Sequence, residues 1–253
     1  MRPSCLLTSL LLAALTSASP IATDSRGSSH LAKKGEKFID YGRRISAGTC
    51  GKCDLSKAVL PQAPIPLPPP TGSLSHVVIG RGTQNYTCDT SNATAVPVAA
   101  GAVATLFNVT CLAVESPDLV ARLPNIALDL PIPYDVQDDS DAPSYYGLSG
   151  YHYFLDGTTA FFNLDTEKHS FGEGAFRKAN ASDAPKTAMV GPKNKGNGAV
   201  PWLLLKAAQG YGGVQAYSEV YRVGTAGGSP PKTCVGQKSK FEIQYATEYW
   251  FYV

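Results

Sequence analysis

The chain has 253 residues, of which 43% are hydrophobic and 17% are charged, a composition typical of globular rather than disordered proteins. It contains 22 lysines and arginines against 20 acids, but seven of those bases and only three of those acids precede Ile45, so the remainder is mildly acidic. This balance gives no electrostatic reason to expect nucleic acid or an anionic membrane as a partner.

The first segment has the pattern of a secretory signal peptide. Arg2 is followed by an apolar run from Leu6 to Leu15 and then by small residues, which predicts residues 1–18 as the signal, cleaved after Ala18. The run is shorter than the roughly 20 residues that span a bilayer, and the final EYWFYV lacks a lipid-anchor signal. We therefore expect a secreted protein of the extracellular space or the cell wall, without a membrane anchor.

Residues 19–44 form a polar, basic leader with two dibasic pairs, Lys33-Lys34 and Arg43-Arg44. Such pairs are plausible cleavage sites in the secretory pathway, and we expect Arg43 and Arg44 to mark the end of a removed propeptide. Residues 45–73 form an arm rich in cysteine and proline. Its proline-rich part, 61–70, is compatible with a linker, with a peptide ligand for an aromatic groove, or with an extended arm laid against the domain. The spaced apolar side chains of Leu60, Ile65 and Leu67 favour the last of these.

From Leu74 onward the pattern is that of short strands, and residues 74–253 are expected to form one β domain. The expected strands are rich in β-branched and aromatic residues and are separated by Gly, Pro, Asn and Asp: HVVIG, TQNYTC, AVATLFNVTC, TTAFFNL, VPWLLLKA, QAYSEVYRVG and TEYWFYV. Only 116–123 looks helical, with Ser116 as N-cap and Pro117 in the first position. The predicted fold is all-β, a single β-sandwich or barrel-like domain with at most short helices.

Five cysteines follow the signal peptide: Cys50, Cys53, Cys88, Cys111 and Cys234. The Cys50-x-x-Cys53 spacing occurs in redox enzymes and in zinc sites, but a redox pair usually opens a helix and a zinc site needs a second close pair. In a secreted chain disulfides are favoured. Because Cys88 and Cys111 end two predicted strands, we expect them to pair, with Cys234 bonded to Cys50 or Cys53 and one cysteine left over. Four glycosylation sequons fit the same compartment, at Asn85, Asn92, Asn108 and Asn180.

Known catalytic patterns are missing from the sequence: it has no dinucleotide fingerprint, no P-loop and no H-E-x-x-H. The segment GYHYFLDGTTAFF offers two interpretations. His152 with Asp156 is a candidate base with its orienting carboxylate, whereas Asp156-Gly157 is also a common turn dipeptide between two strands. The aromatic side chains of this region are candidates for stacking on sugars: Tyr145, Tyr146, Tyr151, Tyr153 and Phe154.

The acidic stretch between Asp135 and Asp141 does not have the spacing of an EF-hand, so a solvated loop is favoured over a calcium site. We expect no metal and no cofactor.

Six motifs together resemble the fungal branch of the secreted family DUF3455: GRGTQNYTC, GAVATLFNVTCLA, GYHYFLDGT, AVPWLLLKA, VYRVGTAGGSPPKTC and YATEYWFY. The resemblance spans residues 50–252. It implies no catalytic residues, because none are established for the family. Some members carry the label malate dehydrogenase, but this sequence lacks the dinucleotide fingerprint and the alternating βα pattern of such an enzyme.

Three hypotheses on function follow. The first is a non-catalytic protein that binds polysaccharide or a protein partner at the cell surface through an aromatic β surface. The second is a hydrolase or lyase of unfamiliar type that uses His152 and Asp156. The third is an interaction protein whose proline arm is the ligand, or a carrier of a small apolar molecule inside a barrel. The sequence favours the first and specifies no oligomeric state.

Overall fold

The computed structural model describes residues 53–92, 94–133 and 147–253. A compact unit of Asp54–Pro133 with Ser149–Val253 holds the fold described below. The signal peptide, the leader with Arg43 and Arg44, Cys50, Tyr145, Tyr146 and the acidic stretch 135–141 lie outside the described residues.

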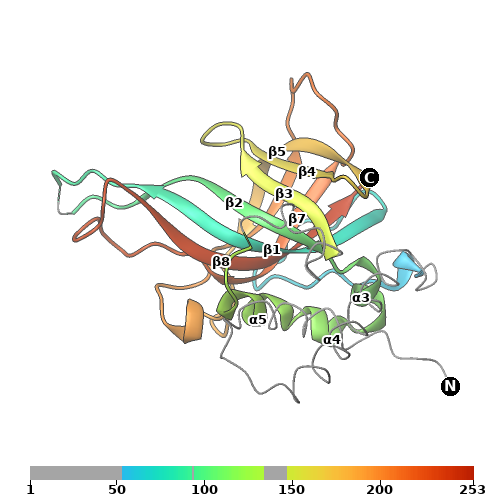
Figure 1. Cartoon of the computed structure of the whole chain (residues 1–253), viewed down its shortest axis with the longest axis horizontal. Coiled ribbons are helices and arrows are strands. Elements are labelled where there is room, and N and C mark those ends of the chain that lie inside the picture. The colour runs from blue at the N-terminus through green and yellow to red at the C-terminus, as the bar shows by residue number, and fades with distance from the viewer. Residues whose placement is uncertain (1–52, 93, 134–146) are drawn as a thin grey trace, which may run out of the picture. The chain divides into compact units, whose positions relative to one another are not determined.

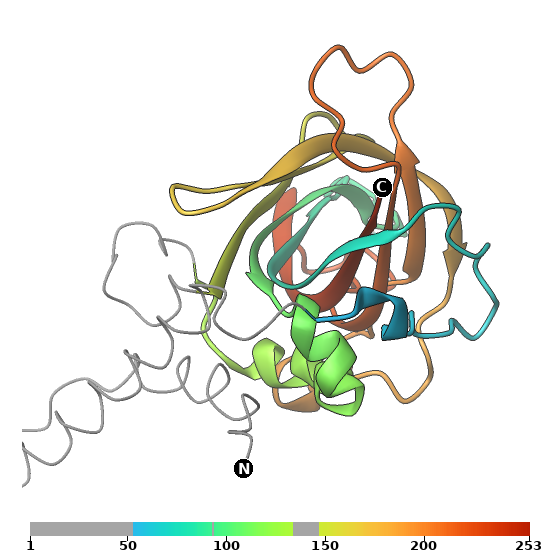
Figure 2. The same cartoon turned by 90° about the vertical axis from the view of Figure 1, so that its right-hand side faces the viewer.

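Strands of the described chain form a closed barrel in which each strand neighbours the next along the sequence and the last pairs antiparallel with the first. Figure 2 shows this ring of strands. The bounds are β1 Leu74–Thr87, β2 Val98–Asn108, β3 Leu148–Phe154, β4 Ala160–Asp165, β5 Ser170–Ser182, β6 Trp202–Ala207, β7 Glu219–Gly227 and β8 Lys240–Tyr252. The predicted all-β fold is confirmed, in its barrel form.

Alternation along the strands divides the side chains into an inner and an outer set. The inner set is mostly apolar and aromatic, with a few polar side chains among them, and rings occupy its centre. Between ring centroids, Phe162 lies 4.9 Å from Tyr249, 5.3 Å from Phe251 and 5.8 Å from Phe176. Gly80 of β1 leaves room for the Tyr249 ring, because a Cβ there would lie 2.7 Å from a ring carbon. The core is therefore filled by side chains at the level of Phe162.

Three short helices cover the outer face of β1, β7 and β8: α3 Thr110–Glu115, α4 Pro117–Val120 and α5 Leu123–Asp129. Figure 1 shows them along one side of the barrel. Leu128 of α5 packs against Ala226 and Ala246. The Arg81 guanidinium donates to the carbonyls of Leu128 and Leu130, where α5 ends. The predicted helix 116–123 was wrong in extent, because α4 ends at Val120 and a second helix, α5, begins at Leu123. The predicted strand through Cys111 was wrong because the chain enters α3 at Thr110.

The proline-rich arm lies against the barrel. The Tyr221 hydroxyl donates to the Pro68 carbonyl over 2.8 Å, and the Ile65 amide donates to Ser182 Oγ over 2.9 Å. The buried Glu219 carboxylate accepts from both the amide and the hydroxyl of Thr71 and pairs with Lys206. These bonds agree with an arm laid against the domain, although the Ile65 side chain itself points to solvent and is 62% exposed.

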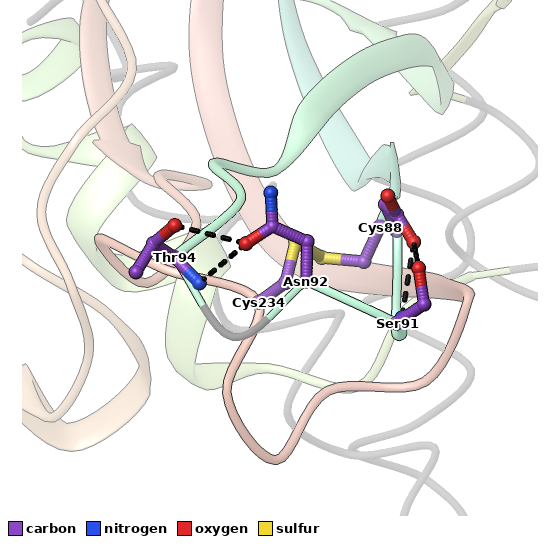
Figure 3. Close-up of a disulfide and its surroundings, with 6 residues drawn as sticks. Cys88, Ser91, Asn92, Thr94 and Cys234 are labelled. Atoms are coloured by element: carbon purple, nitrogen blue, oxygen red, sulfur yellow. Dashed lines mark hydrogen bonds between the residues drawn. A yellow bond between two sulfur atoms is a disulfide. The ribbon is translucent and has the colours of Figure 1, made fainter.

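A disulfide joins Cys88 to Cys234 (Figure 3). The expected pairing of Cys88 with Cys111, and of Cys234 with Cys50 or Cys53, was therefore wrong. The physical reason is that Cys88 follows β1 while Cys234 lies in the connection that leads into β8, and β1 and β8 are hydrogen-bonded neighbours. Cys53 and Cys111 are also disulfide-bonded. In the ranges described above, no helix is long and apolar enough to cross a membrane.

Candidate functional site

The structure does not bring His152 and Asp156 together as a catalytic pair. His152 is on the inward face of β3, where its ring stacks on Phe162 at 4.2 Å and its Nδ1 lies 2.9 Å from the Phe161 carbonyl oxygen. Burial lowers the pKa of His152 to about 4, with a smaller effect of Arg222 in the same direction, so its imidazole is neutral at physiological pH. His152 is a satisfied core side chain.

Asp156 closes the turn between β3 and β4. One carboxylate oxygen accepts from the amides of Thr158 and Thr159 and from the Thr158 hydroxyl, at 2.7, 2.7 and 2.8 Å. These bonds keep the pKa of the exposed Asp156 carboxyl well below its usual range. The predicted hairpin is present, since Phe154 pairs with Ala160 across the turn.

The candidate aromatic side chains fall on opposite faces of β3. Tyr151 and Tyr153 point outward, because His152 between them points into the core. Phe154 points inward and packs over Gly101, where an added Cβ would lie 3.2 Å from the Phe154 Cβ. Phe154 therefore does not belong to a binding surface with the two tyrosines.

Strand register extends the two tyrosines into two rows on the outer face of β3, β4 and β5. In the first row Tyr151 pairs with Asn163 and Asn163 with Glu173. In the second row Tyr153 pairs with Phe161, whose ring centroid is 5.2 Å away. We call this surface the outer aromatic face, and it comprises Tyr151, Tyr153, Phe161, Asn163, Glu173 and Tyr211.

Tyr211 comes from the connection between β6 and β7, and its ring lies 6.0 Å from that of Phe161. This connection is fixed to β5 by backbone bonds from Ala208 to the Ala175 carbonyl and from Ala216 to the Glu173 carbonyl, both 2.8 Å. Neither Tyr211 nor Glu173 was expected from the sequence. The signal for Glu173 is the cross-strand register and that for Tyr211 is the path of a loop, and a single sequence contains neither.

Two polar side chains of this face, Glu173 and Asn163, have hydrogen-bonding atoms available to a ligand. Among the described residues, the Glu173 carboxylate has no ion pair and accepts no hydrogen bond. The Asn163 side-chain oxygen accepts from the Asp165 amide at 2.9 Å, which leaves its amino group to donate outward. Partial burial and then the nearby Glu173 and Tyr211 raise the pKa of Tyr153, so its hydroxyl is a neutral donor at physiological pH.

This arrangement suits a ligand that is apolar on one side and hydroxylated around its rim. Tyr153 is 37% exposed, while its cross-strand neighbour Phe161 is 4% exposed, so the Tyr153 ring is packed on one side and open to solvent on another. A carboxylate acceptor and an amide donor lie in the neighbouring row. A sugar ring has this combination of a C–H face and polar edges.

The barrel interior contains a second histidine that sequence reasoning did not single out. His76 Nε2 lies 2.5 Å from Ser149 Oγ and its Nδ1 lies 3.1 Å from Thr110 Oγ1. Burial, with a smaller contribution from His169, lowers the pKa of His76 to about 4. Ser149 is fully buried, so this pair acts as a satisfied core network. The described ranges contain no group of three or more His, Cys, Asp or Glu side chains able to hold a metal ion.

The four sequons differ in accessibility. Asn92, Asn108 and Asn180 are exposed, whereas Asn85 is half-buried in β1, with partners on both neighbouring strands. The Asn92 side-chain oxygen accepts from the amide and hydroxyl of Thr94, at 3.0 and 2.9 Å. Figure 3 shows its nitrogen, the atom to which a glycan is attached, pointing away from that turn.

Comparison with known proteins gives a family but no relative of known activity. The family model described as "Protein of unknown function (DUF3455)" matches residues 68–253. No curated protein and no solved structure matches the chain. The matched range begins in the proline arm and includes all eight strands of the barrel and the whole outer aromatic face. The chain belongs to the DUF3455 family.

Proposed function

We propose that this is a secreted, non-catalytic protein that binds polysaccharide at the cell surface through the outer aromatic face. The observation that carries the proposal is the pairing of two rows on three adjacent strands, one with the exposed Tyr153 ring and one with the unpaired Glu173 carboxylate. Aromatic anchors beside a few fixed polar groups are the usual composition of a specific binding surface.

Two observations support this hypothesis over the other two. Against an apolar-ligand carrier, aromatic rings fill the barrel interior around Phe162. Against a catalytic pair, His152 and Asp156 have separate hydrogen-bond partners. The disulfide between Cys88 and Cys234 supports secretion, because such bonds persist in oxidising compartments.

Retention on insoluble polysaccharide tests the proposal. The purified full chain is incubated with chitin, β-glucan, cellulose and xylan, and both bound protein and released reducing sugar are measured. We expect retention on at least one polysaccharide without sugar release. Tyr153→Ala should weaken that retention about tenfold or more, because it removes the exposed ring of the face.

Two further variants test which groups of the outer aromatic face contribute to binding. Tyr153→Phe keeps the ring and should retain most of the affinity, whereas Glu173→Gln removes a charged acceptor and should reduce it. Retention of Tyr153→Ala equal to that of the unmodified protein would contradict the role of this face. Sugar release by the unmodified protein would contradict the non-catalytic part of the proposal.

A further inference from the structure

A second group of polar side chains lies inside the barrel, away from the outer aromatic face. Arg222 is on the inward face of β7, since its cross-strand partners Leu203 and Tyr249 both belong to the core. Its guanidinium donates to the Pro201 carbonyl from Nε and Nη2, at 3.2 and 2.9 Å. Within the described ranges no carboxylate pairs with it.

Two tyrosine hydroxyls lie next to this guanidinium. The hydroxyl oxygens of Tyr245 and Tyr249 are 3.0 Å apart, and both side chains are buried. Arg222 is the cross-strand partner of Tyr249, and the Gln84 and Tyr245 side chains both lie against Gly228. Since one hydroxyl donates to the other, one O–H of the pair is still available to donate.

Gln84 contributes a donor that the protein leaves unused. It faces inward from β1 opposite Ala102, is 8% exposed, and its Nε2 has no hydrogen-bond acceptor. A buried amide without an acceptor costs folding free energy, and such groups in native structures are associated with function. A methionine would fill nearly the same volume at this position without that cost.

The cluster is rich in donors and poor in acceptors. Arg222 and Gln84 supply N–H groups around a hydroxyl pair, and the Gly228 carbonyl close to Gln84 already accepts from the Tyr86 hydroxyl. Arginine recognises carboxylate oxygens with two parallel donors, and a partly desolvated site strengthens the attraction. Arg222 is half-buried and Pro201 is exposed, so solvent reaches the guanidinium.

We propose that Arg222, Gln84 and the Tyr245–Tyr249 hydroxyl pair bind the carboxylate group of a small ligand inside this end of the barrel. The ligand is a small organic acid or the carboxylate of an acidic sugar, and both present the same two oxygens. This site is on the inner face of the barrel, so the proposal does not depend on polysaccharide binding by the outer aromatic face.

Calorimetric titration of the full chain with acetate, D-galacturonate and the uncharged D-galactose tests the site. We expect saturable binding of at least one of the two acids and none of galactose. Binding of both acids identifies a small carboxylate as sufficient, and binding of galacturonate alone identifies an acidic sugar. Binding of neither acid, or of galactose as tightly as galacturonate, would overturn the proposal.

Three variants separate binding from folding. Arg222→Gln should weaken acid binding at least thirtyfold. Gln84→Met should weaken it about fivefold while the melting temperature stays the same or rises, a combination that a purely structural glutamine would not give. Gln215→Met is the matched control, because both ends of the Gln215 amide are bonded, to the Ala175 amide and the Tyr217 carbonyl. It should lower the melting temperature and leave acid binding unchanged. Unchanged binding in both Arg222→Gln and Gln84→Met would refute the assignment.

Discussion

At the scale of single residues, Glu248 is a buried acid that has no basic partner among the residues the structure describes. It is 1% exposed, accepts from Trp250 Nε1 at 2.9 Å, and lies on the outer face of β8 between Ile79 and Val223 of the adjacent strands. Burial raises the pKa of its carboxyl from 4.5 to about 7, and the bond from Trp250 opposes that rise only in part. The folded protein therefore holds this proton more tightly than the unfolded chain.

Glu248 should make stability depend on pH. Because its pKa is raised in the folded state, its contribution is fully present below about pH 4.5 and is lost as the pH rises through 7, in total roughly 3 kcal/mol at 1.36 kcal/mol per pKa unit. In Glu248→Gln, which keeps an acceptor for Trp250, the gain in unfolding free energy over the unmodified protein should grow between pH 4.5 and 7 and then level off. Urea unfolding of both proteins at four pH values measures this difference, and a difference independent of pH would show that Glu248 titrates normally.

Single residues also show which positions on the outer aromatic face could be predicted from the sequence and which could not. Tyr151 and Tyr153 were chosen because aromatic residues cluster between positions 145 and 154, and the strand register places both side chains on the outer face. Phe154 was chosen wrongly, because its side chain lies on the inner face of the barrel. Alternate residues of β3 point to opposite faces, and the neighbouring residues in sequence do not show which face is the inner one. Tyr211 was missed because a loop between Gly210 and Gly212 carries no periodic pattern.

At the scale of elements, the arm is held to the barrel by a small number of specific bonds, so its attachment can be weakened separately. Tyr221→Phe removes the hydroxyl that donates to Pro68. We expect a loss of about 1 kcal/mol in unfolding free energy, together with faster amide exchange at Thr71 and faster proteolysis within 61–70. Both follow because the arm is released locally before the barrel unfolds.

Tyr217→Phe is the control for this experiment. The Tyr217 hydroxyl also donates to a backbone carbonyl, but the acceptor is Phe171 of β5 and not a residue of the arm. It should cost similar stability without changing proteolysis in 61–70. Equal protection of the arm in both variants would mean that the Tyr221 bond does not hold it.

The strands also differ in how well they can be predicted from the sequence. β4 and the second half of β8 were predicted because both are rich in aromatic residues, whereas the first half of β8, from Lys240, was not expected. β5 was missed because its second half, from Arg177 to Ala181, is exposed and contains a bulge, so no strict alternation is visible. The end of β2 was predicted too far along the chain because Val109, Thr110 and Cys111 have good strand propensity. In the structure, tertiary contacts favour a helix that begins at Thr110. There its hydroxyl bonds the Val77 carbonyl and amide.

At the scale of the whole molecule, the Cys88–Cys234 disulfide links segments 146 residues apart beside the seam where β1 and β8 close the barrel. A cross-link over so long a loop restricts the unfolded chain strongly. Replacing both cysteines by serine should lower the unfolding free energy by about 2–5 kcal/mol, as measured by urea unfolding. Ser91→Ala, next to the disulfide, removes one exposed hydroxyl and should change stability by less than about 0.5 kcal/mol.

If the double serine variant unfolds at the same urea midpoint as the unmodified protein, strand pairing alone holds the seam between β1 and β8. Its fold is expected to persist, because β1 and β8 pair from Leu74 to Thr87 independently of the cysteines.

The same seam sets an order of events during synthesis. β1 is made early and its partner on one side, β8, is the last strand of the barrel, so one edge of β1 has no native neighbour until residues 240–252 have been made. β1 spans 14 residues without a proline or an acidic side chain, a segment well suited to pairing with another chain. β1 is therefore most exposed to pairing with another chain in the interval between the synthesis of β1 and that of β8. The yield of folded protein should depend on the length of that interval more than on the stability of the finished barrel.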